Sequence, residues 1–404
     1  MNYQEYDEVF DQKKYPKFRE IEKKDTWLVG VYRVMPEDYG PCLCMSGKNF
    51  KFCCKERMIN AYRDILNGKR RLTRDEIYEQ RPKKILSRKI VNSSIAKKNI
   101  SYCFAKKIFC DCDTANYNVK SHTMAKGNVF RNLSGNYVMG FDDHIMEDEA
   151  TIENIGKFFE EVSVDDASTT VSFCKTHDTL LFGDIELEGK REYNKSYIEN
   201  LEYALKAITY DIYYRILRVR YLATLFSEHV ECADNKYIED YKENVDVLFA
   251  LYEQANCILQ DIKSYKEKGS ESPNFQTTII EVPLKKIQYS LSECIVFGGK
   301  NCFLNVVNIP KPYILISYYG QEKINFFEKK KIKFESDFFG FIEEVVDLTL
   351  STTHNIFFNL EAFKKLSDET KQYLYQLHRR GSDENEMGIP KKVKKEIRVF
   401  LFEE

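Results

Sequence analysis

The sequence predicts an α+β protein that combines a small zinc knuckle, a second zinc module, a long helical hairpin and a C-terminal α+β domain. Three features support this fold class. Apolar residues recur at helical spacing in the middle of the chain, short β-branched runs follow them, and most of the 12 cysteines gather in two places. With 43% hydrophobic and 31% charged residues over 404 positions, the chain can bury a core and is too apolar to be disordered.

A chain of this length is typical of two to three domains, which we divide into six segments. We expect an N-terminal segment (1–37), a zinc knuckle (38–60), a basic helical segment (61–99), a treble-clef-like zinc module (100–192), a helical hairpin (193–268) and an α+β domain (269–404).

The N-terminal residues are polar and charged, and they lack the apolar core of a signal peptide. No run approaches the roughly 18 apolar residues that a membrane helix needs. We therefore expect a cytoplasmic protein with no membrane partner. In a reducing cytosol, closely spaced cysteines more often bind metal than form disulfides.

Charge is segregated along the chain, although the formal total is only -2. Residues 48–98 hold 16 Lys and Arg against 5 Asp and Glu, a net charge of +11. Residues 142–166 hold 10 acidic residues and one Lys, a net charge of -9. The basic segment is expected to attract phosphate by neutralising backbone charge and releasing counterions. A solvated helix face is the alternative that its composition leaves open.

The first cysteine cluster lies in the sequence GPCLCMSGKNFKFCCKE. Two ligand pairs joined by a Ser46-Gly47 turn can close a tetrahedron of four thiolates, which leaves no spare coordination position. The cluster therefore predicts a structural zinc. Its ligands are Cys42, Cys44, Cys53 and Cys54. The flanking lysines favour thiolate over thiol; they are Lys48, Lys51 and Lys55.

This order of residues resembles the SEC-C zinc motif, found at the C-terminal tail of the bacterial protein-translocation ATPase and in many unrelated proteins. The match is Cys, one residue, Cys, one residue, Ser-Gly, five residues, Cys-Cys; Met45 stands where Gly is common. The resemblance implies a surface that docks on a protein or a ribosome, and it implies no catalysis. The chain has no GxxxxGK followed by Ser or Thr, so it is not a translocation ATPase.

A looser cluster lies between residues 100 and 190. A ligand pair on a knuckle and a second pair at a helix start is the treble-clef plan for zinc. Cys174 and His177, three apart in FCKTHD, can face one ion at a helix N-terminus. The candidate ligands are Cys103, Cys110, Cys112, Cys174 and His177. The spacing leaves open whether His122 is a fourth ligand that replaces Cys103 or Cys112.

The order of a cysteine pair, a histidine and Cys-x-x-His is similar to the HNH and related ββα-metal nucleases. In that family the central histidine activates water for attack on phosphate, and nearby Asn, His or Asp groups hold a divalent ion. Carried over by position, the resemblance implies His122 as the general base. It implies Asp178 or Asn132 as ligands of a catalytic Mg or Mn.

The middle of the chain predicts an antiparallel helical hairpin. Ser196 followed by Glu199 has the pattern of a capping box. Apolar residues then recur at three- and four-residue steps as far as Val219, and the pattern resumes from Ile238 to Ile262 after the polar break ECADNK. We expect this hairpin to serve in packing or in a homodimer.

The last third predicts a small α+β domain without a chemical motif. TTIIEVPL, CIVFGG, FLNVVNI and YILISYYG are β-branched and aromatic runs bounded by Gly and Pro, which is typical of strands. Helices are expected at about 336–350 and 367–380, the second capped by Ser367. The remaining cysteines are expected in the core; they are Cys232, Cys257, Cys294 and Cys302.

Two functions are consistent with these features. The first is a zinc-binding protein that engages DNA or RNA, with an HNH-like module that acts as a metal-dependent nuclease; the resemblance associates such proteins with bacterial defence against phage. The second is a non-enzymatic adaptor that docks on a protein or a ribosome through the SEC-C knuckle. The sequence leaves open whether the module is active, and an activity of the C-terminal domain has no signature.

Overall fold

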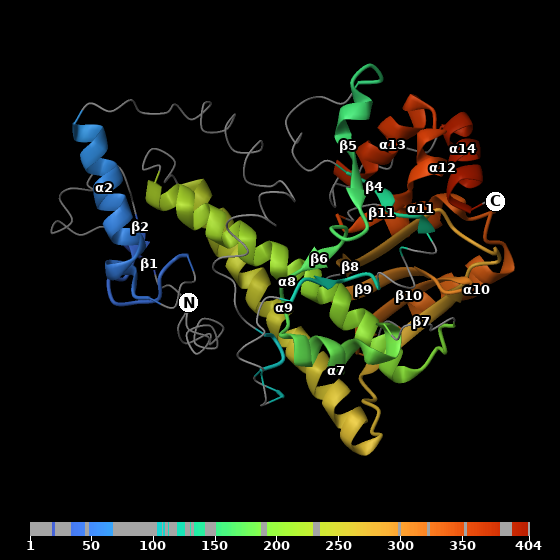
Figure 1. Cartoon of the computed structure of the whole chain (residues 1–404), viewed down its shortest axis with the longest axis horizontal. Helices are drawn as coiled ribbons and strands as arrows, with labels where there is room; N and C mark the ends of the chain where they lie inside the picture. The colour runs from blue at the N-terminus through green and yellow to red at the C-terminus, as the bar shows by residue number, and fades with distance from the viewer. Residues whose placement is uncertain are drawn as a thin grey trace. The chain divides into compact units, whose positions relative to one another are not determined.

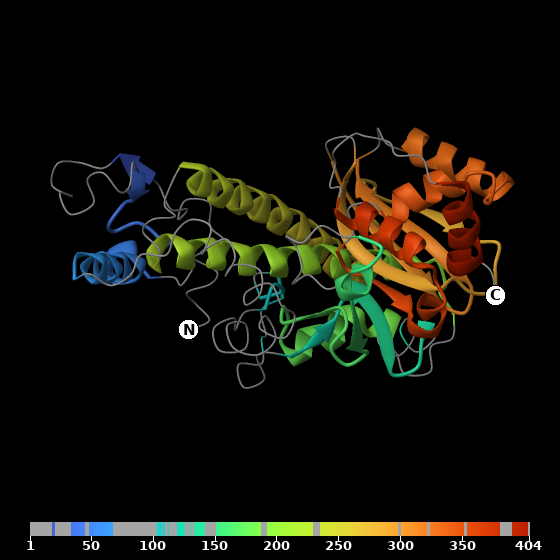
Figure 2. The ribbon, with the colours of Figure 1, turned by 90° about the horizontal axis from the view of Figure 1, so that it is seen from above.

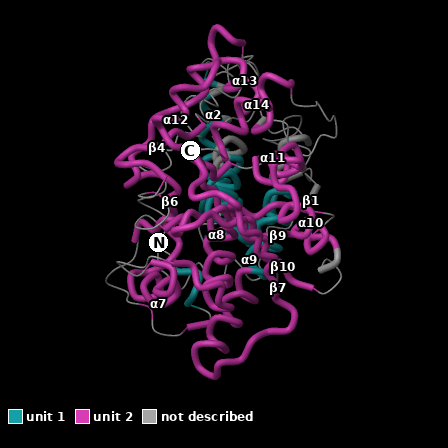
Figure 3. The backbone as a smooth tube through the Cα atoms, turned by 90° about the vertical axis from the view of Figure 1, so that its right-hand side faces the viewer, with its two compact units in different colours: residues 1–107, 212–254 teal, residues 108–211, 255–404 magenta. Residues whose placement is uncertain are grey.

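Figures 1 and 2 show the computed structural model of the chain in two views. The structure describes residues 18–20, 34–44, 48–67, 103–106, 108–109, 112, 119–125, 130, 133–141, 151–186, 192–228, 235–297, 300–320, 324–350, 354–379 and 390–402. The chain forms two compact units, coloured separately in Figure 3. The first comprises residues 1–107 and 212–254, and the second residues 108–211 and 255–404.

The first unit begins with a short antiparallel strand pair, followed by a 3-10 turn and a helix. These elements are β1 (Phe18–Glu20), β2 (Val34–Pro36), η3 (Phe50–Phe52) and α2 (Cys54–Leu66). Arg19 of β1 lies opposite Met35 of β2. Most of the predicted basic segment, from residue 68 onward, lies outside the described residues.

Two long helices, α8 (Tyr197–Glu228) and α9 (Asn235–Lys268), pass through both units. The predicted capping box begins α8. The Glu199 carboxylate accepts from the Ser196 backbone N–H at 3.2 Å, and the Ser196 hydroxyl accepts from the Glu199 N–H at 3.4 Å. The helix therefore starts where its cap residues predict.

The two helices run antiparallel, so the predicted helical hairpin is confirmed. In the second unit, the Tyr197 ring at the start of α8 lies 5.4 Å from the Tyr265 ring near the end of α9. In the first unit, Arg215 of α8 donates to Asn244 of α9 at 2.8 Å. None of the helices among the described residues is both long enough and apolar enough to cross a bilayer.

The second unit is built on a seven-stranded antiparallel sheet with the order β5-β4-β11-β8-β9-β10-β7. Its strands are β4 (Tyr137–Phe141), β5 (Phe159–Ser163), β7 (Phe275–Glu281), β8 (Tyr289–Phe297), β9 (Lys300–Asn308), β10 (Pro312–Tyr319) and β11 (Ile356–Asn359). The four predicted runs form β7 to β10, and the α+β class is confirmed.

One face of the sheet packs against the C-terminal helices, which Figure 2 shows gathered around it. They are α10 (Ile324–Ser336), α11 (Ile342–Leu350), α12 (Leu360–Lys364), α13 (Asp368–Arg379) and α14 (Lys391–Phe402). Alternate residues of β9, such as Leu304 and Val306, share one buried cluster with Phe334, Val346 and Leu401 of these helices. The period-2 alternation of the strand places them on this face.

The opposite face packs against parts of α8 and α9 that belong to the same unit. Asn305 of β9 donates to the Tyr203 carbonyl of α8 at 3.3 Å. Tyr319 of β10 donates to the Asp261 carboxylate of α9 at 2.8 Å. Because both faces are covered, the strands are nearly continuous apolar runs in the sequence.

Some expectations for this region need correction. The helix expected at 336–350 begins only at Ile342, after α10 has ended at Ser336. The sheet also includes β4, β5 and β11, which were not expected from the sequence. Among the four cysteines expected in the core, Cys302 is buried, Cys294 is half-buried and Cys257 is exposed. Cys232 lies outside the described residues.

Phe358 of β11 tests the core of the sheet, because its ring lies between three elements. It is 5.9 Å from Phe141 of β4, 5.5 Å from Phe363 of α12 and 5.9 Å from Phe400 of α14. We expect Phe358→Ala to lower the free energy of unfolding by about 3–5 kcal/mol, measured by urea denaturation with zinc present. Val399→Ala, at a position 49% exposed on α14, should change it by less than about 0.5 kcal/mol. Equal losses in both variants would contradict this core.

Candidate metal centres

The first cysteine group forms where the chain folds back after β2. The Cys42 N–H donates to the Lys48 carbonyl at 2.9 Å, and the Phe50 N–H donates to the Gly40 carbonyl at 2.9 Å. Pro41 and Asn49 face each other in an isolated antiparallel bridge. This short ladder brings the two cysteine pairs into register.

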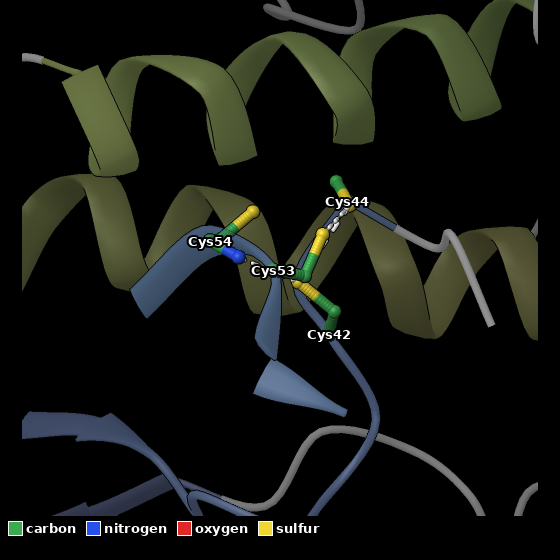
Figure 4. Close-up of side chains that lie close together, drawn as sticks. All are labelled: Cys42, Cys44, Cys53 and Cys54. Carbon is green, nitrogen blue, oxygen red and sulfur yellow. Dashed lines mark hydrogen bonds between the residues drawn. The ribbon is translucent and has the colours of Figure 1, made fainter. Parts of the chain in front are cut away.

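Figure 4 shows the four thiols, two from each arm of the turn. The ligand atoms of Cys42, Cys44, Cys53 and Cys54 all lie within 4.8 Å of one another. The Cys44 sulfur is 3.6 Å from that of Cys42 and 3.5 Å from that of Cys53. Sulfurs bound to a tetrahedral zinc at about 2.3 Å are roughly 3.8 Å apart, so the spacing suits this ion.

The crowding of these four sulfurs disfavours their thiolate forms in the absence of an ion. The neighbouring Cys44 sulfur is the largest of the causes that raise the pKa of Cys42, and the Cys42 sulfur does the same for Cys54. Four thiolates so close together repel one another unless a positive ion lies between them. The group could therefore hold a metal ion, and its all-sulfur donor set is consistent with zinc.

The turn is also anchored to the hairpin within the first unit. The Tyr241 hydroxyl of α9 donates to the Leu43 carbonyl at 2.9 Å, and both side chains are buried. The flanking lysines bind other groups: Lys55 pairs with Asp38 at 2.6 Å, and Lys51 donates to the Tyr39 hydroxyl at 2.8 Å.

The second group consists of Cys103, Cys112, Cys174 and His177, whose ligand atoms all lie within 4.8 Å of one another. The His177 Nδ1 is 3.4 Å from the Cys112 sulfur and 3.3 Å from the Cys174 sulfur. A sulfur and a nitrogen on one tetrahedral zinc are roughly 3.5 Å apart. A Cys₃His set of this kind could also hold a metal ion and is consistent with zinc.

The helix α7 (Lys175–Glu186) positions two of these ligands. Cys174 immediately precedes the helix, and His177 lies in its first turn. The Phe109 ring packs 5.8 Å from the His177 ring, and Lys263 of α9 donates to the Ile108 carbonyl at 2.9 Å. Phe109 and Ile108 thus contact α7 and α9 respectively.

His122 does not belong to this metal group. It lies on β3 (Ser121–His122), which pairs with β6 (Thr169–Thr170), so that His122 faces Thr169 across the pair. Its Nε2 lies 3.0 Å from the Val164 carbonyl, within hydrogen-bond distance. The structure therefore brings Cys103 and Cys112, and not His122, to the zinc candidate.

Asp178 lies next to the metal group on α7, but its carboxylate faces Ser121. The side chain of Ser121 donates to it, and burial raises its pKa. Lys206 of α8 opposes that rise through its charge. Successive strand residues point to opposite faces, so His122 and Asp178 lie on different sides of β3. Asn132 and Cys110, the other candidates, lie outside the described residues.

A set of buried ionisable side chains around α7 was not predicted from the sequence. Lys206 is 1% exposed and donates to the His122 carbonyl at 2.6 Å while pairing with Glu186 at 2.6 Å. Glu202, one turn earlier in α8, is fully buried and pairs with Lys266 at 3.1 Å. Glu202 and Lys206 lie four residues apart among the apolar positions of α8, and this spacing could have indicated buried charges.

Metal content tests both groups. We expect elemental analysis of the purified chain to find two zinc ions per molecule, because each set of four ligands completes one tetrahedron. Cys53→Ser and Cys174→Ser should each lose one ion and lower the melting temperature. Cys257→Ser, at an exposed cysteine outside both groups, should keep two. A Cys174→Ser protein that still holds two zinc ions would contradict the second site.

The burial of Glu202 predicts how the stability of the protein depends on pH. Burial raises its pKa from 4.5 to about 8, against the opposing charge of Lys266. The folded state therefore holds a proton that the unfolded state releases between these values. Its contribution to stability is complete below pH 4.5 and is lost as pH rises towards 8.

We expect Glu202→Gln to gain stability relative to the wild type as pH increases from about 6 to about 8.5, measured by urea denaturation. The difference between the two proteins removes titrations that both share. Glu267→Gln, with an exposed side chain on α9, should follow the wild type throughout. Parallel curves for Glu202→Gln and wild type would refute the raised pKa.

Comparison of the chain with protein-family models, with curated proteins and with solved structures finds no match. The candidate function therefore depends on the residues and on the geometry of the two metal-candidate groups.

Proposed function

We propose that this chain is a zinc-binding protein that engages nucleic acid, with the basic segment 48–98 holding the phosphate backbone. The observation that carries the proposal is the place of this segment between the two metal-candidate groups. It begins at Lys48, inside the first group, and ends at Lys98, shortly before Cys103. A net charge of +11 can neutralise several phosphates, and the metal ions would fix both ends of the segment.

We place the candidate cleavage centre in the β3–β6–α7 unit. Its order, two antiparallel strands and a helix that begins with zinc ligands, supports the resemblance to ββα-metal nucleases. The separation of His122 and Asp178 on opposite sides of β3 weighs against His122 acting as a base beside an ion held by Asp178. This geometry counts against cleavage by this pair and leaves the proposed binding unaffected.

A docking adaptor of the SEC-C type is the second candidate. The observation that favours it is the exposure of two large rings beside the first group: Tyr39 is 67% exposed and Phe52 62% exposed. Such side chains are commonly found where a partner binds. Under this proposal the partner is a protein or a ribosome, and co-sedimentation with ribosomes without affinity for free nucleic acid would favour it.

Binding of labelled DNA and RNA, measured by fluorescence anisotropy over a range of salt concentrations, tests the first candidate. We expect affinity to fall steeply with salt. The triple variant Lys69→Glu/Arg70→Glu/Arg71→Glu should bind weakly, and its salt slope should be smaller by about 0.9 for each duplex phosphate that the variant no longer neutralises. The matched control reverses three exposed lysines of the second unit, Lys329, Lys391 and Lys395, and should bind like wild type.

The same proteins with Mg or Mn, plasmid DNA and RNA test cleavage. Cutting that His122→Ala abolishes and that His354→Ala retains would establish a nuclease. Binding without cutting would support a non-catalytic zinc protein. Equal salt slopes for the triple variant and its control would rule out the basic segment as the phosphate-binding element.

A further inference from the structure

The surface beside the first cysteine group carries two aromatic rings and a lysine, which we call the knuckle face: Tyr39, Lys51 and Phe52. The ring centroids of Tyr39 and Phe52 are 6.3 Å apart and the rings are inclined at 65°. Both rings are more than 60% exposed. Large rings are costly to expose, so a pair of them on one surface indicates a binding role.

The backbone holds these rings in place before any partner arrives. The Lys51 N–H donates to the Asp38 carbonyl at 2.8 Å, and the Phe52 N–H donates to the Asn49 carbonyl at 3.1 Å. Between these segments, Phe50 is fully buried and anchors the turn. A turn whose backbone is already ordered loses little backbone conformational freedom on binding, which favours affinity.

The charge around the rings is positive. The Lys51 ammonium lies 4.8 Å from the centroid of Tyr39 and 5.6 Å from that of Phe52. The Asp38 carboxylate is paired with Lys55. Among the exposed charged side chains nearest in sequence, Lys48, Lys51 and Arg57 outnumber Glu37 and Glu56, and the rest of the basic segment follows them.

We infer that the knuckle face binds unpaired bases of a single-stranded nucleic acid. Exposed rings beside a cation match a base and its phosphate, since any base can stack on an aromatic ring while a lysine meets the backbone. Unpaired bases are required because a duplex hides its base faces. The Lys51 ammonium beside both rings favours a nucleotide, which brings a phosphate as well as a flat ring, over an uncharged protein surface.

This inference rests on the proposed function and specifies its substrate. Binding of a labelled single-stranded oligonucleotide is compared with binding of the duplex of the same sequence. We expect Tyr39→Ala and Phe52→Ala each to weaken single-strand binding by about tenfold, and to leave duplex binding unchanged. Phe52→Tyr should keep the affinity because it keeps a ring. Phe326→Ala, at an exposed ring of the second unit, should have no effect.

A 2-aminopurine base in the oligonucleotide gives a readout that a merely structural role would not change. Its fluorescence should be quenched by wild type through stacking and much less by Phe52→Ala, although zinc content shows that the variant keeps both ions. The Lys69/Arg70/Arg71 variant should lose binding to both duplex and single strand, whereas Phe52→Ala should lose only single-strand binding. This difference would support the binding of unpaired bases by the knuckle face.

Unchanged single-strand affinity in both ring variants would overturn the inference and leave the proposed function standing. A wild-type chain that binds no nucleic acid would overturn both. Capture of a ribosome or protein by wild type and not by Phe52→Ala, with no affinity for free oligonucleotide, would assign the knuckle face to docking and would also overturn the inference.

Discussion

Closely spaced thiolates repel one another, and a bound cation removes that repulsion. In the first group the constraint is severe, because the four sulfurs lie within 4.8 Å and neighbouring sulfurs raise the pKa of Cys42 and of Cys54. The turn around them buries few large side chains, Leu43 and Phe50 among them. A metal ion bound here would supply what a small apolar core cannot, and the order of this turn, with Tyr39 and Phe52 beside it, would depend on that ion.

The second group works differently, since its helix is also held by charge. Lys206 and Glu202 of α8 hydrogen-bond beside and within α7: the His122 carbonyl of β3 accepts from Lys206, and the Glu202 carboxyl oxygen accepts from the Ile185 N–H of α7 at 3.2 Å. Buried polar and charged groups are costly unless they are hydrogen-bonded or paired, so their arrangement permits few alternative positions of α7. A metal ion held by Cys174 and His177 at the start of the helix would add to these contacts in fixing the position of α7.

Local spacing was sufficient to predict the features that depend on neighbouring residues. The Cys42–Cys54 set and the Ser196 cap depend on contacts within about a dozen positions, and β7 to β10 were predicted from their β-branched and aromatic runs; the structure places them as expected. The strands β4, β5 and β11 could not be predicted in this way. β4 and β11 pair across more than 200 positions, with Met139 opposite Phe358, and no local pattern encodes such a contact.

The same kind of contact explains the long interval between His122 and Cys174. β3 and β6 pair directly, so the chain leaves the strand pair after Thr123 and returns at Ser168, whose carbonyl accepts from the Thr123 N–H at 2.7 Å. Between these points it supplies β4 and β5 to the large sheet.

The described part of the acidic stretch, residues 151–166, lies between β3 and β6 in the chain, and ion pairs partly neutralise its charge. Glu161 of β5 pairs with Lys364 at 3.0 Å, and Asp166 pairs with Lys120. Judged by sequence spacing alone, the interval between His122 and Cys174 is too long for a compact strand–strand–helix unit. Because β3 and β6 still pair, the residues inserted between them leave the two strands next to each other and next to α7.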